Sequence, residues 1–168
     1  PTPNDRLLPP LLEELDFLPN EQIVLINALG LHRAETEQEL RSRLGEEIVN
    51  NYRIVQHDGM SADGLRYLGR SRFGHEVFIN RAYLEASVRI LTGFIEPHFF
   101  AGFSGGPKAV LPGIAGASLV LDNHGPDMLD DPRATWGVTT GNPVWEEMLE
   151  VALMTAPTLL LNVTLNRE

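Results

Sequence analysis

Short apolar runs that alternate with helix-patterned segments restrict the fold of this chain most strongly. Residues 23–29 (IVLINAL), 88–95 and 159–165 are largely apolar runs of strand length. Such runs are typical of strands that are buried on both faces. Strands that alternate with helices indicate an α/β domain. We therefore expect a Rossmann-like, largely parallel sheet with helices on both of its faces.

Local signals place the other elements. Thr36 and Glu39 match a capping box, which predicts a helix that runs to Leu44 and, after Gly45, on to Val49. Asn80 is a candidate cap for a short helix that ends at Ala86. The remaining predicted elements are helices over 9–15, 114–123 and 144–154, a strand over 53–56, and one inserted β-hairpin that pairs 65–68 with 76–79.

Size and charge limit the classes of partner. A chain of 168 residues fits a single domain, and a net charge of −10 argues against nucleic-acid and acidic-membrane partners. Because there is no cysteine, disulfides, thiolate catalysis and cysteine-ligated metal sites are excluded. The longest uncharged apolar run, 109–121, is too short to span a membrane. No signal-peptide pattern is visible, so the expected location is cytoplasmic.

The two ends of the sequence suggest a piece of a longer protein. The chain begins at Pro1 without an initiator methionine, and it stops directly after the apolar run 159–165. We therefore expect residues 1–168 to be a single α/β domain within a longer, two-domain protein.

One lysine stands out in a chain that otherwise uses arginine. Of the 13 basic residues, 12 are arginine and one is Lys108. An amine can act as a nucleophile or be acylated, whereas a guanidinium stays protonated. Lys108 is also the only charged residue in the glycine-rich stretch 97–121. A lysine in such apolar surroundings should have a lowered pKa and be nucleophilic when neutral.

The glycines before this lysine favour close contact with a ligand. Glycine-rich backbone can turn its amides toward an anion, which makes Ser104, Gly105 and Gly106 candidate binding residues. The stretch does not match a P-loop, because Pro107 lacks an amide hydrogen and Ala109 replaces the hydroxyl that would hold magnesium.

Three histidines lie near predicted element ends. His32 and His98 each follow a predicted strand, and His124 ends the predicted helix 114–123. Ligands of open α/β sheets bind where the strands end, so His32 and His98 are candidate neighbours. Taken singly, each of the three histidines is better explained by a structural role.

Two alternative interpretations remain open at this point. His32, His98 and His124 could form the three-histidine site of a zinc-dependent hydrolase, although this leaves Lys108 and the glycine-rich stretch unexplained. The chain could also be a non-catalytic α/β module whose histidines are incidental.

Four sequence blocks stand out: 30–36 (GLHRAET), 96–108 (EPHFFAGFSGGPK), 111–114 (LPGI) and 122–124 (DNH). Together they resemble the nickel-pincer lactate racemase family, and the resemblance covers nearly the whole chain. It implies the N-terminal, cofactor-binding domain of an isomerase that racemises 2-hydroxy acids, with lactate as the first expectation.

The resemblance also implies a cofactor and a role for each candidate residue. The cofactor would be a nickel-pincer nucleotide, pyridinium-3-thioamide-5-thiocarboxylic acid mononucleotide, with nickel bound to the ring carbon and to both sulfurs. Lys108 would form its covalent thioamide tether, and Ser104, Gly105 and Gly106 would face its phosphate. His124 would ligate nickel, which imidazole suits. His32 and His98 would be the two catalytic bases.

Further partners follow from the same resemblance. They are a small 2-hydroxy acid substrate, the cofactor-biosynthesis enzymes, and a C-terminal domain of the same protein that closes over the substrate. Family members also carry an Asp-x-Thr-Arg segment just upstream of the position that corresponds to Pro1. We therefore expect the isolated fragment to be inactive on its own.

Overall fold

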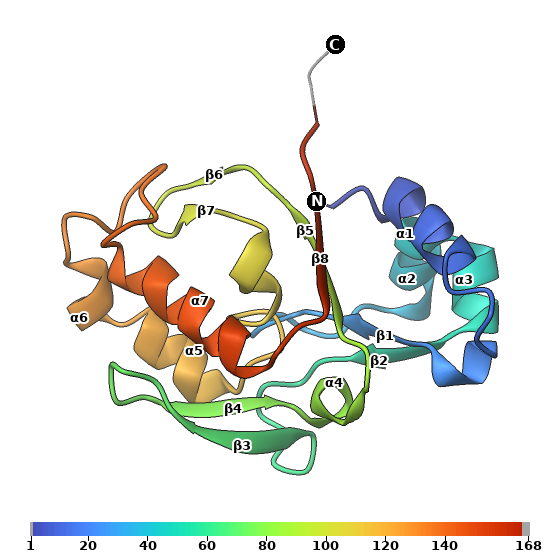
Figure 1. Cartoon of the computed structure of the whole chain (residues 1–168), viewed down its shortest axis with the longest axis horizontal. Helices are drawn as coiled ribbons and strands as arrows, with labels where there is room; N and C mark the ends of the chain where they lie inside the picture. Colours follow the sequence, from blue (N-terminus) through green and yellow to red (C-terminus); the bar gives the residue numbers. More distant parts are fainter. Residues whose placement is uncertain (1, 166–168) are drawn as a thin grey trace.

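Helices and strands alternate along the chain in the computed structural model, which describes residues 2–165 (Figure 1). The helices are α1 (Asn4–Glu13), α2 (Glu37–Leu44), α3 (Glu46–Asn51), α4 (Arg81–Glu85), α5 (Ala117–Asn123), α6 (Pro126–Leu129) and α7 (Pro143–Met154), with short 3-10 turns η1 (Asn20–Gln22) and η2 (Gly106–Ala109). The strands are β1 (Val24–Asn27), β2 (Arg53–Gln56), β3 (Leu65–Arg70), β4 (Glu76–Asn80), β5 (Ile90–Phe94), β6 (Pro97–His98), β7 (Gly102–Phe103) and β8 (Leu159–Val163). The mixed α/β class is as predicted.

None of the helices over residues 2–165 is both long and apolar enough to cross a bilayer.

The strands pair two by two instead of forming one sheet. β1 pairs with β2 and β5 with β8, both in parallel, whereas β3 with β4 and β6 with β7 are antiparallel. Within residues 2–165 this differs from the single Rossmann-like sheet that we expected. The strands are also less covered than predicted, since Leu159 and Leu160 of β8 are 50% and 45% exposed. Apolar runs indicate strands, but they do not specify which strands become neighbours.

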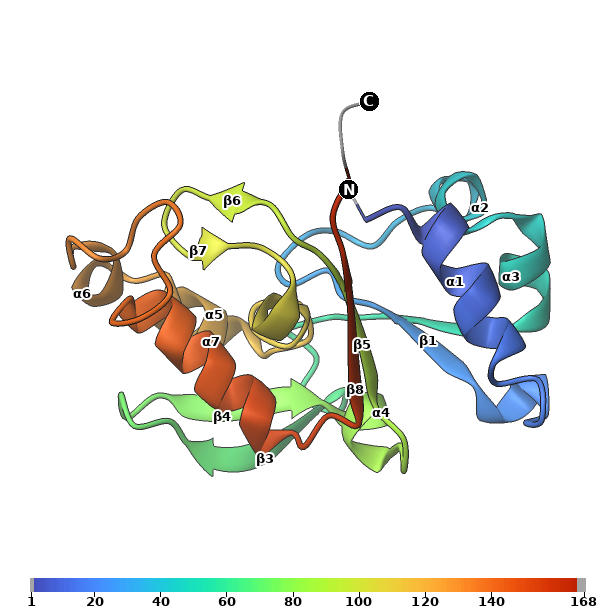
Figure 2. The ribbon, with the colours of Figure 1, turned by 45° about the horizontal axis from the view of Figure 1, so that its top comes forward.

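Two hydrophobic clusters hold the elements together. Helices α1, α2 and α3 lie at one end of the molecule, whereas α5, α7, β3 and β4 lie at the other, with β5 and β8 between the two groups (Figures 1 and 2). The smaller cluster joins the first three helices to the start of β1 through Leu8, Leu12, Ile23, Leu40, Leu44 and Ile48. The larger cluster includes Val77, Ile79, Leu111, Leu119, Val144 and Met148. Residues that follow β5 therefore lie against the larger cluster.

Some helix ends are set by capping residues, whereas others are set by the packing of apolar side chains. The capping box at Thr36 is confirmed, because its hydroxyl accepts from the Glu39 amide while the Glu39 carboxylate accepts from the Thr36 amide. Helix α1 begins at Asn4 and not at residue 9, so its two prolines lie inside it. Burial of three leucines on one face of α1 holds these residues in the helix.

Helix α5 also begins later than predicted. It starts at Ala117 and not at residue 114, because the preceding segment forms a tight turn. The Gly113 amide donates to the Lys108 carbonyl at 3.1 Å, and a Cβ on Gly113 would lie 2.3 Å from the Ala109 carbonyl oxygen. This turn connects η2, which carries Lys108, to α5, which ends at His124.

A buried carboxylate links three elements of the larger cluster. Glu147 of α7 is fully buried. It accepts hydrogen bonds from the Ser71 hydroxyl at 2.6 Å, from His75 Nδ1 at 2.8 Å and from Asn123 Nδ2 at 2.9 Å. A buried charge is tolerated when donors surround it in this way. Glu147 therefore ties the turn between β3 and β4, and the last residue of α5, to α7.

We expect Met148→Ala to destabilise the chain by about 2–5 kcal/mol, because the substitution leaves a cavity in the larger cluster. Met148 is 0% exposed, whereas its neighbour Leu149 is 42% exposed. The matched variant Leu149→Ala should cost less than about 1 kcal/mol. Urea unfolding followed by circular dichroism measures both values, and equal losses would contradict the assignment of the core.

Candidate active site

The candidate residues after β5 come from three different elements. His98 lies in β6, Lys108 lies in η2, and His124 is the C-cap residue of α5. The β6–β7 pair was not predicted from the sequence. It returns the chain so that η2 packs beside β5 and α7.

His98, Lys108 and His124 all lie around the aromatic ring of Phe100. The His98 and His124 rings both meet it edge-on, with centroids 4.5 and 4.9 Å from that of Phe100. Lys108 Nζ lies 5.7 Å from the same centroid. Asn142, the N-cap of α7, donates from Nδ2 to the Phe100 carbonyl at 2.8 Å. The structure thus brings His98, Lys108 and His124 together around an aromatic side chain that the sequence did not single out.

His124 has a defined tautomer. Its Nδ1 lies 3.0 Å from the Val120 carbonyl oxygen, and since a carbonyl only accepts, Nδ1 carries the hydrogen. Burial lowers the pKa of His124, the positive charge of Lys108 lowers it further, and the Val120 bond and Glu147 oppose the shift. The ring is therefore neutral near pH 7 with a lone pair on Nε2. A metal ligand needs this state, and its second nitrogen is commonly held by such a carbonyl.

His98 accepts a hydrogen bond at Nδ1, whereas His124 donates one from the same atom. The Ala101 amide donates to its Nδ1 at 3.3 Å, so the neutral ring carries its hydrogen on Nε2. Burial lowers the pKa of His98, as do the charges of Lys108 and His124, while Glu96 raises it. The ring also stacks on Phe99 with centroids 4.7 Å apart. To accept a proton, His98 must release the Ala101 amide from Nδ1, because tautomer exchange would also place a hydrogen on Nδ1.

The Lys108 amine has a pKa suited to nucleophilic chemistry near neutral pH. Burial lowers its pKa to about 8 from an ordinary value of 10.5. No other side chain of the sequence carries a primary amine. A neutral, partly desolvated amine can attack an electrophilic carbon and become acylated.

The glycine-rich turn before Lys108 is fastened to the ends of two strands. The Ser104 amide donates to the Glu96 carbonyl at 2.8 Å, and the Gly106 amide donates to Asn162 Oδ1 at 3.1 Å. In this conformation these two amides already have hydrogen-bond acceptors within the chain. The Gly105 amide donates to no acceptor within residues 2–165.

His32 lies in a separate hollow of about 460 Å³ near the carboxyl ends of β1 and β2. Its lining includes His32, Arg33, Asp58, Met60 and Leu121. Within the described part of the chain, no ring contact joins His32 to the Phe100 group. The link runs through the backbone instead, because the Gly30 amide donates to the Gly113 carbonyl at 2.9 Å and the Gly113 amide donates to the Lys108 carbonyl.

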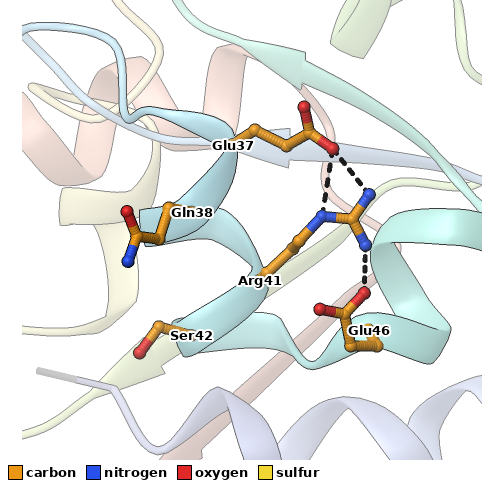
Figure 3. A pocket seen from close by; sticks show the side chains of 5 residues that line it. All are labelled: Glu37, Gln38, Arg41, Ser42 and Glu46. Carbon is orange, nitrogen blue, oxygen red and sulfur yellow. Dashed lines mark hydrogen bonds and ion pairs between the residues drawn. The ribbon is translucent and has the colours of Figure 1, made fainter.

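Other polar features have structural roles. His57, to which the sequence gave no function, donates from Nε2 to the Ala115 carbonyl at 2.9 Å and accepts at Nδ1 from Asn80. The hollow in Figure 3 lies between α2 and α3 and is lined by Glu37, Gln38, Arg41, Ser42 and Glu46. There Arg41 is paired with Glu37 and Glu46. This exposed ion-pair group is not part of the Phe100 group.

The three-histidine zinc site is not formed. Among residues 2–165, no three His, Cys, Asp or Glu side chains approach closely enough to hold one metal ion. The geometric reason is that His32 lies in its own hollow, while His98 and His124 contact the Phe100 ring.

The chain is similar to known proteins along its whole length. Residues 1–137 match the model of the lactate racemase N-terminal domain. The chain is 36% identical to a lactate racemase of Thermoanaerobacterium thermosaccharolyticum over 167 residues, which are 99% of this chain and 39% of that protein. It is 37% identical to a lactate racemase of Lactiplantibacillus plantarum, covering 100% of this chain and 40% of that protein. The chain thus spans about two fifths of the length of these relatives.

Solved structures agree with this similarity. The lactate racemase apoprotein of Thermoanaerobacterium thermosaccharolyticum superposes with a TM-score of 0.93 at 36% identity, over 98% of this chain and 40% of that chain. A Thermotoga maritima protein superposes with a TM-score of 0.73 at 24% identity, over 86% of this chain and 39% of that chain, which supports the fold alone.

The lowered pKa of Lys108 can be measured directly, because no other lysine competes. We expect acylation of Lys108 by a water-soluble ester to be half-maximal at about pH 8, where the buried amine loses its proton. Peptide-level mass spectrometry against a free reference amine reads this midpoint. In the control Arg66→Lys, the added exposed amine should react with a midpoint near ~10.4. A common midpoint for both amines would show that Lys108 is not withdrawn from water.

Proposed function

This chain belongs to the lactate racemase family, in which it matches the N-terminal domain, and we propose that it is the cofactor-holding part of an enzyme that racemises lactate. The observation that carries the proposal is the convergence of His98, Lys108 and His124 on Phe100. The cofactor we propose is the nickel-pincer nucleotide, tethered through Lys108.

The residues present fit such a group. A thioamide tether forms from the neutral fraction of a primary amine, and burial increases that fraction by lowering the pKa of Lys108 to about 8. A nickel ligand requires a neutral imidazole with a free lone pair, and His124 keeps Nε2 free by donating from Nδ1 to Val120. We therefore propose Lys108 as the tether and His124 as the protein ligand to nickel.

We propose that the turn formed by Ser104, Gly105 and Gly106 contacts the phosphate of the nucleotide. Only Gly105 keeps an amide without an acceptor within residues 2–165, so Gly105 would donate first. Ser104 and Gly106 would then act by shaping the turn.

The chemistry of lactate dictates what the histidines must do. The α-hydrogen beside an ionised carboxylate is a poor acid, so it is better moved as a hydride. When bound, the cofactor would supply an acceptor and donor for that hydride. As the carbon becomes a ketone, the hydroxyl proton must leave to a base, and on return of the hydride a proton must come back to the oxygen. Two mirror-image substrates therefore need two bases, for which we propose His32 and His98.

The two proposed bases differ in their surroundings. His32 is exposed in its hollow, where water reaches its ring. His98 is partly buried, and its lowered pKa keeps it neutral and able to take a proton near pH 7 once Nδ1 is released from Ala101.

We propose racemisation as the activity of the complete protein, which is longer than this chain. The chain spans about 40% of its relatives' length, and we propose that a C-terminal domain closes over the substrate. Enzymes that build the cofactor would be its other partners. A cytoplasmic location stays a prediction from the sequence.

Replacing the amine should abolish the tether. In full-length protein produced together with the cofactor-making enzymes, Lys108→Arg keeps the positive charge but cannot form a thioamide, so the covalent adduct should disappear from the intact mass. The control Arg66→Lys should keep one adduct, located at Lys108. An adduct that survives Lys108→Arg would remove the lysine from the proposal.

Replacing the bases should separate catalysis from metal binding. In the full-length enzyme, His32→Ala and His98→Ala should each lower the racemisation rate by about 10²–10⁴-fold while nickel stays bound, since neither is a proposed ligand. His124→Ala should lose nickel. Metal analysis and polarimetry on the same samples give both readouts. Loss of nickel in the first two variants would contradict the assigned roles.

A further inference from the structure

Asn162 lies on a strand that the proposed mechanism does not use. It belongs to β8, where it is the register partner of Gly93 in β5. Its side chain reaches past Gly93 toward the glycine-rich turn, and its Oδ1 accepts the Gly106 amide at 3.1 Å. An amide side chain from a strand distant in sequence therefore contacts the turn that precedes Lys108.

Gly93 makes room for this contact. A Cβ at Gly93 would lie 2.5 Å from Asn162 Oδ1, 2.9 Å from Gly105 Cα and 3.1 Å from the Gly106 nitrogen. The first two distances are shorter than real Cβ contacts, and the third is tighter than most of them. Gly105 has φ of +74°, and a Cβ there would lie 3.1 Å from the same Asn162 oxygen. Asn162 thus fits a space that glycine at both positions keeps open.

The other side of the turn is fastened independently. The Ser104 hydroxyl donates to the Phe94 carbonyl at 2.6 Å and accepts the Glu96 amide at 3.0 Å. Ser104 therefore joins the turn to the end of β5, and Asn162 joins it to β8. The Lys108 amide donates to the Gly105 carbonyl at 3.1 Å, so η2 begins directly on this turn.

We propose that Asn162 is a positioning residue for Lys108, because it holds the Gly105–Gly106 turn so that the amine stays withdrawn from water beside Phe100. The hydrogen bond between Asn162 and Gly106, and the space that Gly93 leaves for it, carry this inference. Only the use of the amine as a cofactor tether rests on the proposed function. Asn162 touches neither substrate nor cofactor in this role.

Hydrogen exchange at the Gly106 amide tests the contact. In the unsubstituted chain this amide should exchange at least about tenfold more slowly than a free glycine amide, because it is hydrogen-bonded. Asn162→Ala should remove that protection, and Asn162→Asp should retain it because a carboxylate oxygen still accepts. An unprotected Gly106 amide in the unsubstituted chain would overturn the proposal without the need for any variant.

The acylation midpoint of Lys108 tests the consequence. Asn162→Ala and Gly93→Ala should both raise the midpoint from about pH 8 toward that of an exposed lysine, since either change releases the turn. The control Leu160→Ala, on the exposed part of the same strand, should leave the midpoint unchanged. An unchanged midpoint in folded Asn162→Ala and Gly93→Ala would overturn the positioning role.

These results are independent of the cofactor. Absence of any adduct on Lys108 in the loaded, unsubstituted enzyme would reject the proposed function while leaving the exchange and midpoint results intact. Conversely, a normal adduct together with an unchanged midpoint in folded Asn162→Ala would reject the positioning role alone.

Discussion

The amine of Lys108 is withdrawn from water beside the ring of Phe100, and burial is the cause of its lowered pKa. Among residues 2–165, no carboxylate forms an ion pair with it. Burial also lowers the pKa values of His98 and His124, and the positive charge of the protonated Lys108 amine lowers both further. Burial therefore keeps the two imidazoles neutral near pH 7 and increases the neutral, nucleophilic fraction of the amine there.

Desolvation of this kind requires a rigid frame, and the frame uses contacts far from the reactive atoms. Asn162 and Ser104 fasten the turn before Lys108, and Asn142 holds the backbone of Phe100. Glu147 binds Asn123, the residue that precedes His124. Each contact joins elements that are distant in sequence, so the arrangement depends on the tertiary fold more than on any single loop. A buried carboxylate such as Glu147 is costly to bury, and its three donors offset that cost.

The candidate reactive residues could be identified from the sequence, whereas the residues that position them could not. Lys108 was identified because a chain rich in arginine retains one amine, and His98 and His124 because they follow predicted elements. Phe100, Asn142 and Asn162 carry no such signal, since an aromatic or amide side chain shows its role only once its neighbours are known.

Capping at Thr36 was predictable because it depends on four consecutive residues. The pairing of strands was not, because an apolar run is compatible with several neighbours, and the zinc alternative was excluded only by the position of His32.

A crystal structure of the full-length protein, produced with the cofactor-making enzymes and soaked with lactate, tests the central claim most directly. The account predicts continuous density from Lys108 Nζ into a nucleotide whose nickel is bound by Nε2 of His124, with His32 and His98 facing opposite sides of the substrate. A nucleotide attached elsewhere, with Lys108 Nζ extended into solvent, would contradict it.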